Sequence, residues 1–203
     1  MKKFVILASL LSVIACKKDQ EKNDEPGIMD AVENVQNLNN AAEGLKDFEK
    51  RIEELKKMKP VSNDVYKTVL TEEIDGLKRI SYNAGNTTMV GMSSAEATYG
   101  DNAGKNIKLT ILDGAGESGS AIISIMVMGL SVDTESIEGT TTKKSEEIDG
   151  VKYLTENDTN TENPRSSITF IHDERFQVSL EGNKIGLDEL KSILKKIDLS
   201  KLN

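Results

Sequence analysis

Apolar side chains recur every three or four residues between residues 28 and 58, a spacing that predicts a helix with one apolar face. The stripe comprises Ile28, Val32, Val35, Leu38, Ala42, Leu45, Phe48, Ile52 and Leu55. Pro26 and Gly27 precede the stripe and Pro60 follows it, so we expect a long amphipathic helix within residues 28–60. The opposite face is charged. The apolar face therefore packs on the folded body or pairs with another helix, unless the helix is a solvated spacer.

Beyond Pro60 the apolar period shortens toward two, which is typical of strands separated by turns. We expect strands over residues 77–83, 89–100, 106–114, 151–158, 166–173 and 175–183. The last two are joined through Asp173 and Glu174 and predict a β-hairpin. One face of this hairpin carries Ile168, Phe170, Phe176, Val178 and Leu180, with His172 a further candidate. Two segments have helical character, residues 118–132 and 186–199.

A short internal echo supports this division of the chain. The heptapeptide EEIDGLK at residues 72–78 recurs as EEIDGVK at residues 146–152. Because strands followed by one helix occur in each half, a duplicated βββα unit is one interpretation. Residues 61–203 therefore predict an α+β domain, a mainly antiparallel sheet with two packed helices, preceded by the long N-terminal amphipathic helix.

The first residues have the pattern of an export signal. Two lysines precede an apolar run of about twelve residues, which is shorter than the roughly 20 residues of a membrane-spanning helix. The run ends in Val13, Ile14, Ala15 and Cys16. These four residues resemble the lipobox of bacterial lipoproteins, and the alternative is an uncleaved anchor with a chance cysteine. The resemblance implies that residues 1–15 are removed and that Cys16 carries a lipid such as palmitate.

Residues 16–27 contain charged and amide side chains, Pro and Gly, which predicts a flexible tether behind the lipidated cysteine. The charges after Cys16 are similar to outer-membrane sorting signals and to surface-export signals of Bacteroidetes. We therefore expect a protein that is lipid-anchored in the cell envelope, at the outer membrane. Two or more acyl chains would make this anchorage effectively permanent.

Composition and charge exclude several functions. The net charge of −8 would repel a phosphate backbone, so we expect no nucleic-acid partner. Cys16 is the only cysteine, which rules out an intrachain disulfide.

No residue pattern predicts catalysis, a metal site or a cofactor. Gly114, Gly116 and Gly119 have the G-x-G-x-x-G spacing, but no Walker lysine follows and Glu117 would oppose a phosphate, so we expect a strand-to-helix turn. His172 is the only histidine, and we expect it to be solvated in the hairpin turn. Residues 156–164 offer oxygen ligands without ordered EF-hand spacing, which favours a polar loop over a calcium site.

The most apolar segment after the signal is AIISIMVMGL at residues 121–130. It is too short to span a bilayer, and a core helix is the first interpretation. Its methionines would also suit an adaptable cleft for a lipid or peptide.

Together these features resemble bacterial lipoproteins with a small α+β domain, and the element order is similar to the Mog1/PsbP-like sandwich. We expect a non-enzymatic module that binds another envelope component or an apolar ligand, with its membrane contact made through the lipid. Two alternatives stay open. One is an envelope hydrolase that uses carboxylates as acid and base. The other is a structural lipoprotein that oligomerises through a coiled coil.

Overall fold

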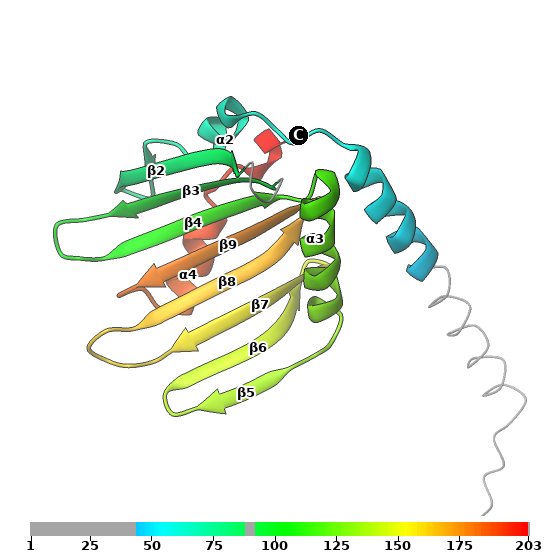
Figure 1. Cartoon of the computed structure of the whole chain (residues 1–203). Helices are drawn as coiled ribbons and strands as arrows, with labels where there is room; N and C mark the ends of the chain where they lie inside the picture. Colours follow the sequence, from blue (N-terminus) through cyan, green and yellow to red (C-terminus); the bar gives the residue numbers. More distant parts are fainter. Residues whose placement is uncertain (1–43, 88–91, 203) are drawn as a thin grey trace, which may run out of the picture. The chain divides into compact units, whose positions relative to one another are not determined.

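The computed structural model describes residues 44–87 and 92–202, which form nine β-strands and four α-helices (Figure 1). The first helix spans residues 44–57. The other helices are α2 (Asn63–Val69), α3 (Gly116–Leu130), α4 (Leu187–Leu194) and the 3-10 turn η1 (Leu199–Leu202). The strands are β1 (Glu73–Ile74), β2 (Leu77–Thr87), β3 (Met92–Gly100), β4 (Asn106–Asp113), β5 (Glu135–Glu138), β6 (Thr141–Ile148), β7 (Val151–Asp158), β8 (Arg165–His172) and β9 (Phe176–Asn183).

All nine strands belong to one antiparallel sheet, in the order β1-β2-β3-β4-β9-β8-β7-β6-β5. The predicted α+β class with an antiparallel sheet is therefore confirmed. The six expected strands correspond to β2, β3, β4, β7, β8 and β9, whereas β1, β5 and β6 were not predicted. The strands β5 and β6 lie at one edge, and β5 is exposed throughout. Edge strands have little core to contact, so their residues lack the alternation that reveals a strand.

Three hairpin turns depend on a left-handed backbone. The predicted hairpin is confirmed: Asp173 and Glu174 join β8 to β9 with φ of 51° each. The two echoing heptapeptides form equivalent turns, because Asp75 (φ 50°) with Gly76 joins β1 to β2 and Asp149 (φ 53°) with Gly150 joins β6 to β7. Both glycines have φ of 78°, which favours residues without a Cβ. The repeated heptapeptide thus forms the same local turn twice.

The hydrophobic core lies against one face of the sheet. Alternate residues of the central strands point into it, including Leu109, Ile111, Val178 and Leu180, all fully buried. The predicted hairpin face is confirmed, because Ile168, Phe170 and Phe176 share this core. Helix α4 covers the core with Leu190 and Ile193, and α2 and η1 contact each other at its margin. The opposite face of the sheet is polar and half-exposed, with side chains such as Lys108 and Ser179.

One expected helix boundary is confirmed and one requires correction. Residues 44–57 are helical, and the helix ends shortly before Pro60 as predicted, because a residue before proline avoids the helical region. Residues 28–43 of the expected helix lie outside the described residues. The C-terminal helix ends at Leu194 instead of 199, where the chain turns so that Ile197 and Leu202 reach the core.

Helix α3 contacts β3, β7, β8 and β9 and runs along the strand ends (Figure 1). Two of its glycines differ in their surroundings. A Cβ at Gly119 would lie 2.5 Å from the carbonyl oxygen of Asp113 and 2.8 Å from the carbonyl carbon of Gly114, whereas a Cβ at Gly129 would have nothing within 4 Å. Gly119 is therefore required by the packing of α3 on the end of β4, and Gly129 has no such role within residues 44–87 and 92–202.

These surroundings predict opposite effects of the same substitution. Gly119→Ala should lower the free energy of unfolding by about 1–3 kcal/mol, because backbone atoms must move. Gly129→Ala should raise it by about 0.5–1 kcal/mol, because alanine favours a helix interior. Urea denaturation of the two variants beside the parent measures both effects. Equal midpoints for the two variants would contradict the packing of α3 described above.

Candidate interaction site

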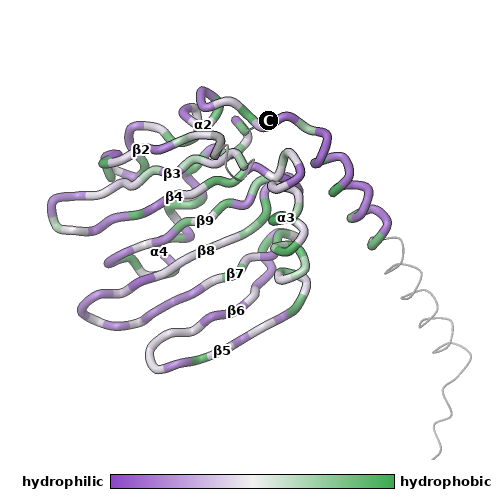
Figure 2. Tube along the Cα trace, in the orientation of Figure 1, coloured by the Kyte–Doolittle hydropathy of each residue, from purple (hydrophilic) through white to green (hydrophobic). Residues whose placement is uncertain are grey.

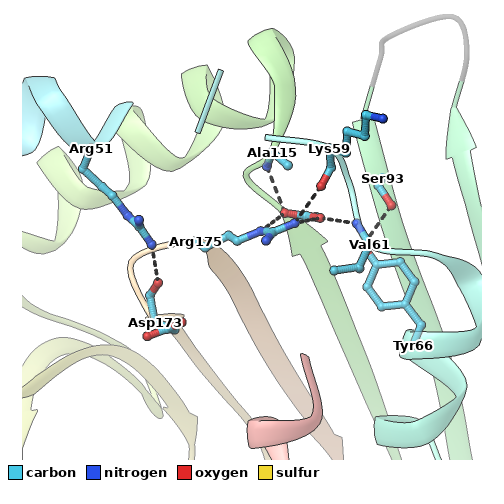
Figure 3. Close-up of polar contacts among 9 residues, drawn as sticks. Arg51, Lys59, Val61, Tyr66, Ser93, Ala115, Asp173 and Arg175 are labelled. Atoms are coloured by element: carbon cyan, nitrogen blue, oxygen red, sulfur yellow. Dashed lines mark hydrogen bonds and ion pairs between the residues drawn. The ribbon is translucent and has the colours of Figure 1, made fainter. Parts of the chain in front are cut away.

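A fully buried carboxylate stands where four segments of the chain meet. Asp113 ends β4, and its Oδ1 accepts hydrogen bonds from the backbone N–H of Ala115 at 2.9 Å and from Nε of Arg175 at 2.7 Å. Its Oδ2 accepts from the N–H of Val61 and from Nη2 of Arg175, both at 2.8 Å (Figure 3). Each oxygen thus has two donors, so neither is free for a substrate or a metal. We call Asp113, Arg175, Lys59, Val61 and Ala115 the Asp113 junction.

The arginine of the Asp113 junction links the sheet to the segment before α2. Arg175 begins the chain after the β8–β9 turn and also donates to the carbonyl oxygen of Lys59 at 3.1 Å. Its guanidinium lies over the ring of Phe176, 4.8 Å from the centroid. The hydrogen bonds with Asp113 raise the pKa of Arg175, so the guanidinium stays charged. The Asp113 junction is therefore a structural connection between the sheet and the segment before α2.

A second arginine fastens the helix 44–57 to the same turn. Arg51 donates from Nη2 to the carbonyl oxygen of Asp173 at 3.1 Å (Figure 3), and its Nε lies 3.5 Å from the carboxylate of Glu174. One turn further along the helix, the side chain of Leu55 is fully buried. The described part of the predicted amphipathic helix thus packs on the body at its C-terminal end, while Leu45 is 57% exposed.

A cavity of about 690 Å³ separates the N-terminal half of this helix from α3. Its walls include Phe48 and Ile52 from the helix and Ile123, Val127 and Leu130 from α3. The two helices contrast in polarity, since residues 44–57 are mostly purple in Figure 2 and α3 is mostly white to green. The cavity therefore lies between a mostly charged helix and residues 118–130 of α3, which carry no charge, and its lining also includes the charged residues Asp47, Arg51, Lys152, Asp173 and Glu174.

Helix α3 exposes apolar side chains to solvent, the reverse of what a surface helix normally shows. Ile123 and Leu130 are buried as predicted for a core helix, but Ile125 is 71% exposed, Met128 63% and Val132, just after the helix, 57%. Ala121 and Gly129 are also exposed. No charged residue occurs from Ser118 to Val132. We call Ala121, Ile125, Met128, Gly129 and Val132 the α3 outer stripe.

The glycine-rich segment forms the expected strand-to-helix turn. Gly114 donates its N–H to the carbonyl oxygen of Arg175 at 2.9 Å, and a Cβ at Gly114 would lie 2.6 Å from that oxygen. Gly116 has φ of 83°, a conformation that glycine adopts without strain. Glu117 is exposed at the start of α3. These glycines serve close packing around the Asp113 junction.

The prediction for His172 was wrong. The residue ends β8, is half-buried, and its Nε2 is buried without a hydrogen-bond partner in the part of the chain that the structure describes. The physical reason is that a two-residue turn, Asp173 and Glu174, leaves His172 within the strand and on the core-facing side. The hairpin pattern contained this signal, because His172 alternates in phase with Ile168 and Phe170.

The polar loop after β7 forms hydrogen bonds within itself and to the β5–β6 turn. Asp158 accepts from the Thr140 hydroxyl at 2.6 Å and from the N–H of Asn160 at 3.0 Å. Asn160 in turn accepts from the N–H groups of Glu162 and Asn163. Across residues 44–87 and 92–202, no three His, Cys, Asp or Glu side chains are grouped so that they could hold a metal ion. Cys16, the expected lipidation site, lies outside the described residues.

Sequence reasoning missed the Asp113 junction and the α3 outer stripe. Asp113 and Arg175 are 62 residues apart, and no local pattern connects them. The α3 outer stripe left a signal, the absence of charge over fifteen residues, but that signal does not distinguish a helix buried all round from one with an open apolar face.

Comparisons with known proteins add little to this geometry. No protein-family model and no curated protein matches the chain. Among solved structures, it is similar to a GTP binding regulator from Thermotoga maritima, with 13% identity, a TM-score of 0.34, and coverage of 66% of this chain and 90% of that chain. A likeness this distant supports no argument about function, and the expected Mog1/PsbP-like sandwich stays a prediction. None of the helices within the described ranges is both long and apolar enough to cross a membrane.

The Asp113 junction predicts a large effect of one substitution. Arg175→Met should lower the free energy of unfolding by about 3–5 kcal/mol, because it leaves the Asp113 carboxylate buried without its counter-charge. Adding Asp113→Asn should restore part of the loss, since the unpaired charge is then removed. Urea denaturation measures both variants.

The matched control is Arg165→Met, which removes an exposed arginine from β8 and should change stability by less than about 0.5 kcal/mol. A loss for Arg175→Met no larger than that of the control would show that the buried pair does not stabilise the fold.

Proposed function

We propose that the chain is a lipid-anchored, non-enzymatic interaction module of the bacterial cell envelope, and that it docks another envelope protein through the α3 outer stripe. The anchor is inferred from the lipobox-like sequence ending in Cys16. The docking face is inferred from the exposure of Ile125, Met128 and Val132. This exposure is the observation that carries the proposal, because water contacts three large apolar side chains within residues 118–132, a segment that contains no charged residue.

The ends of the α3 outer stripe indicate the chemistry of the partner. Glu117 lies exposed at the N-terminal end, and Asp133 and Glu135 lie exposed at the C-terminal end. Asp133 is paired with Lys152 at 3.0 Å, whereas Glu117 and Glu135 form no ion pair with any described residue. An apolar segment with basic residues at both ends would complement this pattern.

The same charges argue against two other occupants. In an antiparallel pairing of two copies, Glu117 of one copy would approach Asp133 and Glu135 of the other, and a parallel pairing would oppose like residues. An anionic bilayer surface would also be repelled by these carboxylates and by a net charge of −8. A protein segment with basic flanks avoids both penalties.

The spacing of the α3 outer stripe suits a partner helix. Ala121, Ile125 and Gly129 follow each other at intervals of four, which places them on one ridge of α3. The small residues on either side of Ile125 would let a second backbone approach closely. From Ala121 to Val132 the α3 outer stripe is about 17 Å long at 1.5 Å per residue, so it accommodates about three turns of a partner helix.

The anchor predicts a change in mass. Chain purified from membranes should lack residues 1–15 and carry diacylglycerol and a further acyl group on Cys16, because lipoproteins with such signals are processed in this way. Intact-mass spectrometry measures both. The Cys16→Ser variant should keep residues 1–15 and gain no lipid. A wild-type chain with an unmodified Cys16 still joined to residues 1–15 would contradict the proposed anchor.

The docking face predicts selective peptide binding. The probe is a fluorescent peptide with a twelve-residue helical segment of alanine and leucine flanked by two lysines at each end, and the second probe has glutamates in place of the lysines. Anisotropy titration of the full chain should give at least tenfold tighter binding of the lysine-flanked peptide. Ile125→Asp should weaken that binding at least tenfold.

Two further variants separate docking from folding. Ile80→Asp is the matched control and should leave peptide affinity unchanged. Ile80 is 68% exposed on β2 and lies in the register shift between Arg79 and Ser81, beside Gly100. Gly100 is at the end of β3 opposite to Ser93, which pairs with Asp113 just before α3. Gly129→Ala should weaken peptide binding even though it stabilises the helix. Equal binding of the two peptides would refute a partner with basic flanks. If the chain self-associates and Ile125→Asp abolishes this self-association, the α3 outer stripe binds a second copy of the chain and the proposed partner is wrong.

A further inference from the structure

The polar face of the sheet, opposite the hydrophobic core, contains an open cavity of about 690 Å³. It lies over the neighbouring strands β4, β9 and β8, at the strand ends away from α3. Most of its lining residues point away from the core, because they alternate along the strands with buried residues such as Ile107, Ile168 and Leu180. Its volume is within the range for ligand pockets, about 300–1,000 Å³. We call this space the sheet-face cavity.

The strand register places six of the lining residues in two parallel rows across these strands. The first row consists of Asn106, Asn183 and Arg165. The second row lies two residues further along and consists of Lys108, Glu181 and Ser167. Neighbours within a row are about 5 Å apart, and the two rows are about 7 Å apart. A small polar molecule in the sheet-face cavity can therefore contact several of these side chains at once.

Serine hydroxyls form the floor of the sheet-face cavity. Ser167 and Ser179 are half-buried on the central strands β8 and β9, where β-branched and aromatic residues are usually preferred. Their short side chains lie among the longer Lys108, Glu181 and Arg165, which explains the hollow. Each hydroxyl can donate and accept a hydrogen bond. Among the described residues, no aromatic or large aliphatic side chain lines the cavity, so its surface suits a hydroxylated ligand and not an apolar one.

One cation in the sheet-face cavity has no ion-pair partner among the described residues. The ammonium of Lys108 is paired with Glu181 at 3.0 Å, and Glu156 is paired with Lys143 at 3.2 Å. Arg165 also lines the cavity and is exposed, but no carboxylate of residues 44–87 or 92–202 forms an ion pair with it. The charged groups that line the cavity therefore leave one positive charge for a ligand.

The carboxylate that stands opposite Arg165 is used elsewhere. Asp158 pairs with Arg165 in the register of β7 and β8, but it accepts hydrogen bonds from the Thr140 hydroxyl at 2.6 Å and from the N–H of Asn160 at 3.0 Å. These two hydrogen bonds contribute more than the charge of Arg165 to the lowered pKa of Asp158. The planar guanidinium of Arg165 is thus open to a ligand, and its geometry favours a carboxylate that binds through both oxygens.

We propose that the sheet-face cavity binds a sugar acid. The carboxylate pairs with Arg165, and the sugar hydroxyls form hydrogen bonds with the hydroxyls of Ser167 and Ser179 and with the amide of Asn183. Ser167 is two residues from Arg165 on β8, about 7 Å, a separation that one pyranose ring with its carboxylate can bridge. The site shares no residue with the α3 outer stripe, so its test is independent of the docking experiment.

Two sugar acids and their neutral parents test the proposal on the full chain: glucuronate with glucose, and galacturonate with galactose. At least one acid should bind with a Kd of about 1 mM, as expected for a ligand of this size, and roughly tenfold more tightly than its parent. Cyclohexanecarboxylate, which has a carboxylate but no hydroxyl, should bind as weakly as the parent sugars. Titration followed by backbone amide resonances measures Kd. The signals of Ser167, Ser179 and Asn183 should move, while those of α4, which covers the opposite face, should not.

Matched substitutions test the cation. Arg165→Met should weaken binding of the acid to the level of its parent, and Arg165→Lys should restore part of the loss, since lysine keeps the charge without the fork. Lys78→Met is the control and should leave Kd unchanged. Lys78 is exposed and forms no ion pair within the described ranges. It stands in the same row as Arg165, four strands away, at about 19 Å.

A trimer of galacturonate distinguishes two sources of the same chemistry. Tighter binding of the trimer than of the monomer would support a uronate unit within a polysaccharide, and equal or weaker binding would support a free sugar acid. Equal affinity for each acid and its parent, equal affinity for the acids and cyclohexanecarboxylate, or a Lys78→Met effect as large as that of Arg165→Met would overturn the proposal. So would amide signals of Ser167, Ser179 and Asn183 that none of the acids moves.

Discussion

The positions of α3 and of the segment that leads into α2 depend on the buried Asp113–Arg175 pair. Asp113 ends β4, Arg175 stands at the start of β9, and β4 and β9 are neighbours at the centre of the sheet. Because the carboxylate also accepts from Val61 and Ala115, it fixes both the segment that leads from the helix 44–57 and the first turn of α3. One charge pair therefore fixes two segments next to helices, the one that follows the helix 44–57 and the one that begins α3.

A buried pair of this kind is a constraint more than a source of stability. Desolvation of the two charges offsets most of their attraction, but removal of either partner is severely destabilising. The pair thus tolerates few alternative arrangements of the four segments around it. The glycines at 114 and 119 have the same effect, because larger residues would meet backbone atoms. The outward direction of α3, with its apolar side chains in water, follows from these local requirements.

The sequence pattern predicted those elements that contacts between residues close in the chain determine. The β8–β9 hairpin was predictable because Ile168, Phe170, Val178 and Leu180 alternate around a two-residue turn. The edge strands β5 and β6 were not predictable, since residues such as Lys143 and Glu147 face solvent and their pairing alone makes them strands. The Asp113 junction joins residues far apart in the chain. Its existence depends on the strand order, which alternation does not encode.

Helix α3 shows the limit of hydrophobicity as a predictor of burial. An uncharged run from Ser118 to Val132 predicts that water is excluded, and this holds for the stripe through Ile123 and Leu130. The side through Ile125 and Met128 has the same composition and no cover among the described residues. Composition therefore predicts that an apolar surface is covered, but it does not predict whether the same chain or another molecule covers it.

A lipid anchor would change what such a surface must achieve. An α3 outer stripe of about 17 Å offers few large side chains, so its affinity for a free partner in solution would be modest. When both partners are held at one membrane, the second contact becomes nearly intramolecular, and the effective concentration reaches the millimolar range for short tethers. A weak apolar contact then suffices for stable association at the membrane, while the detached domain would release its partner. In this arrangement the anchor confers the stability of the complex, and the acidic ends of the α3 outer stripe confer its selectivity.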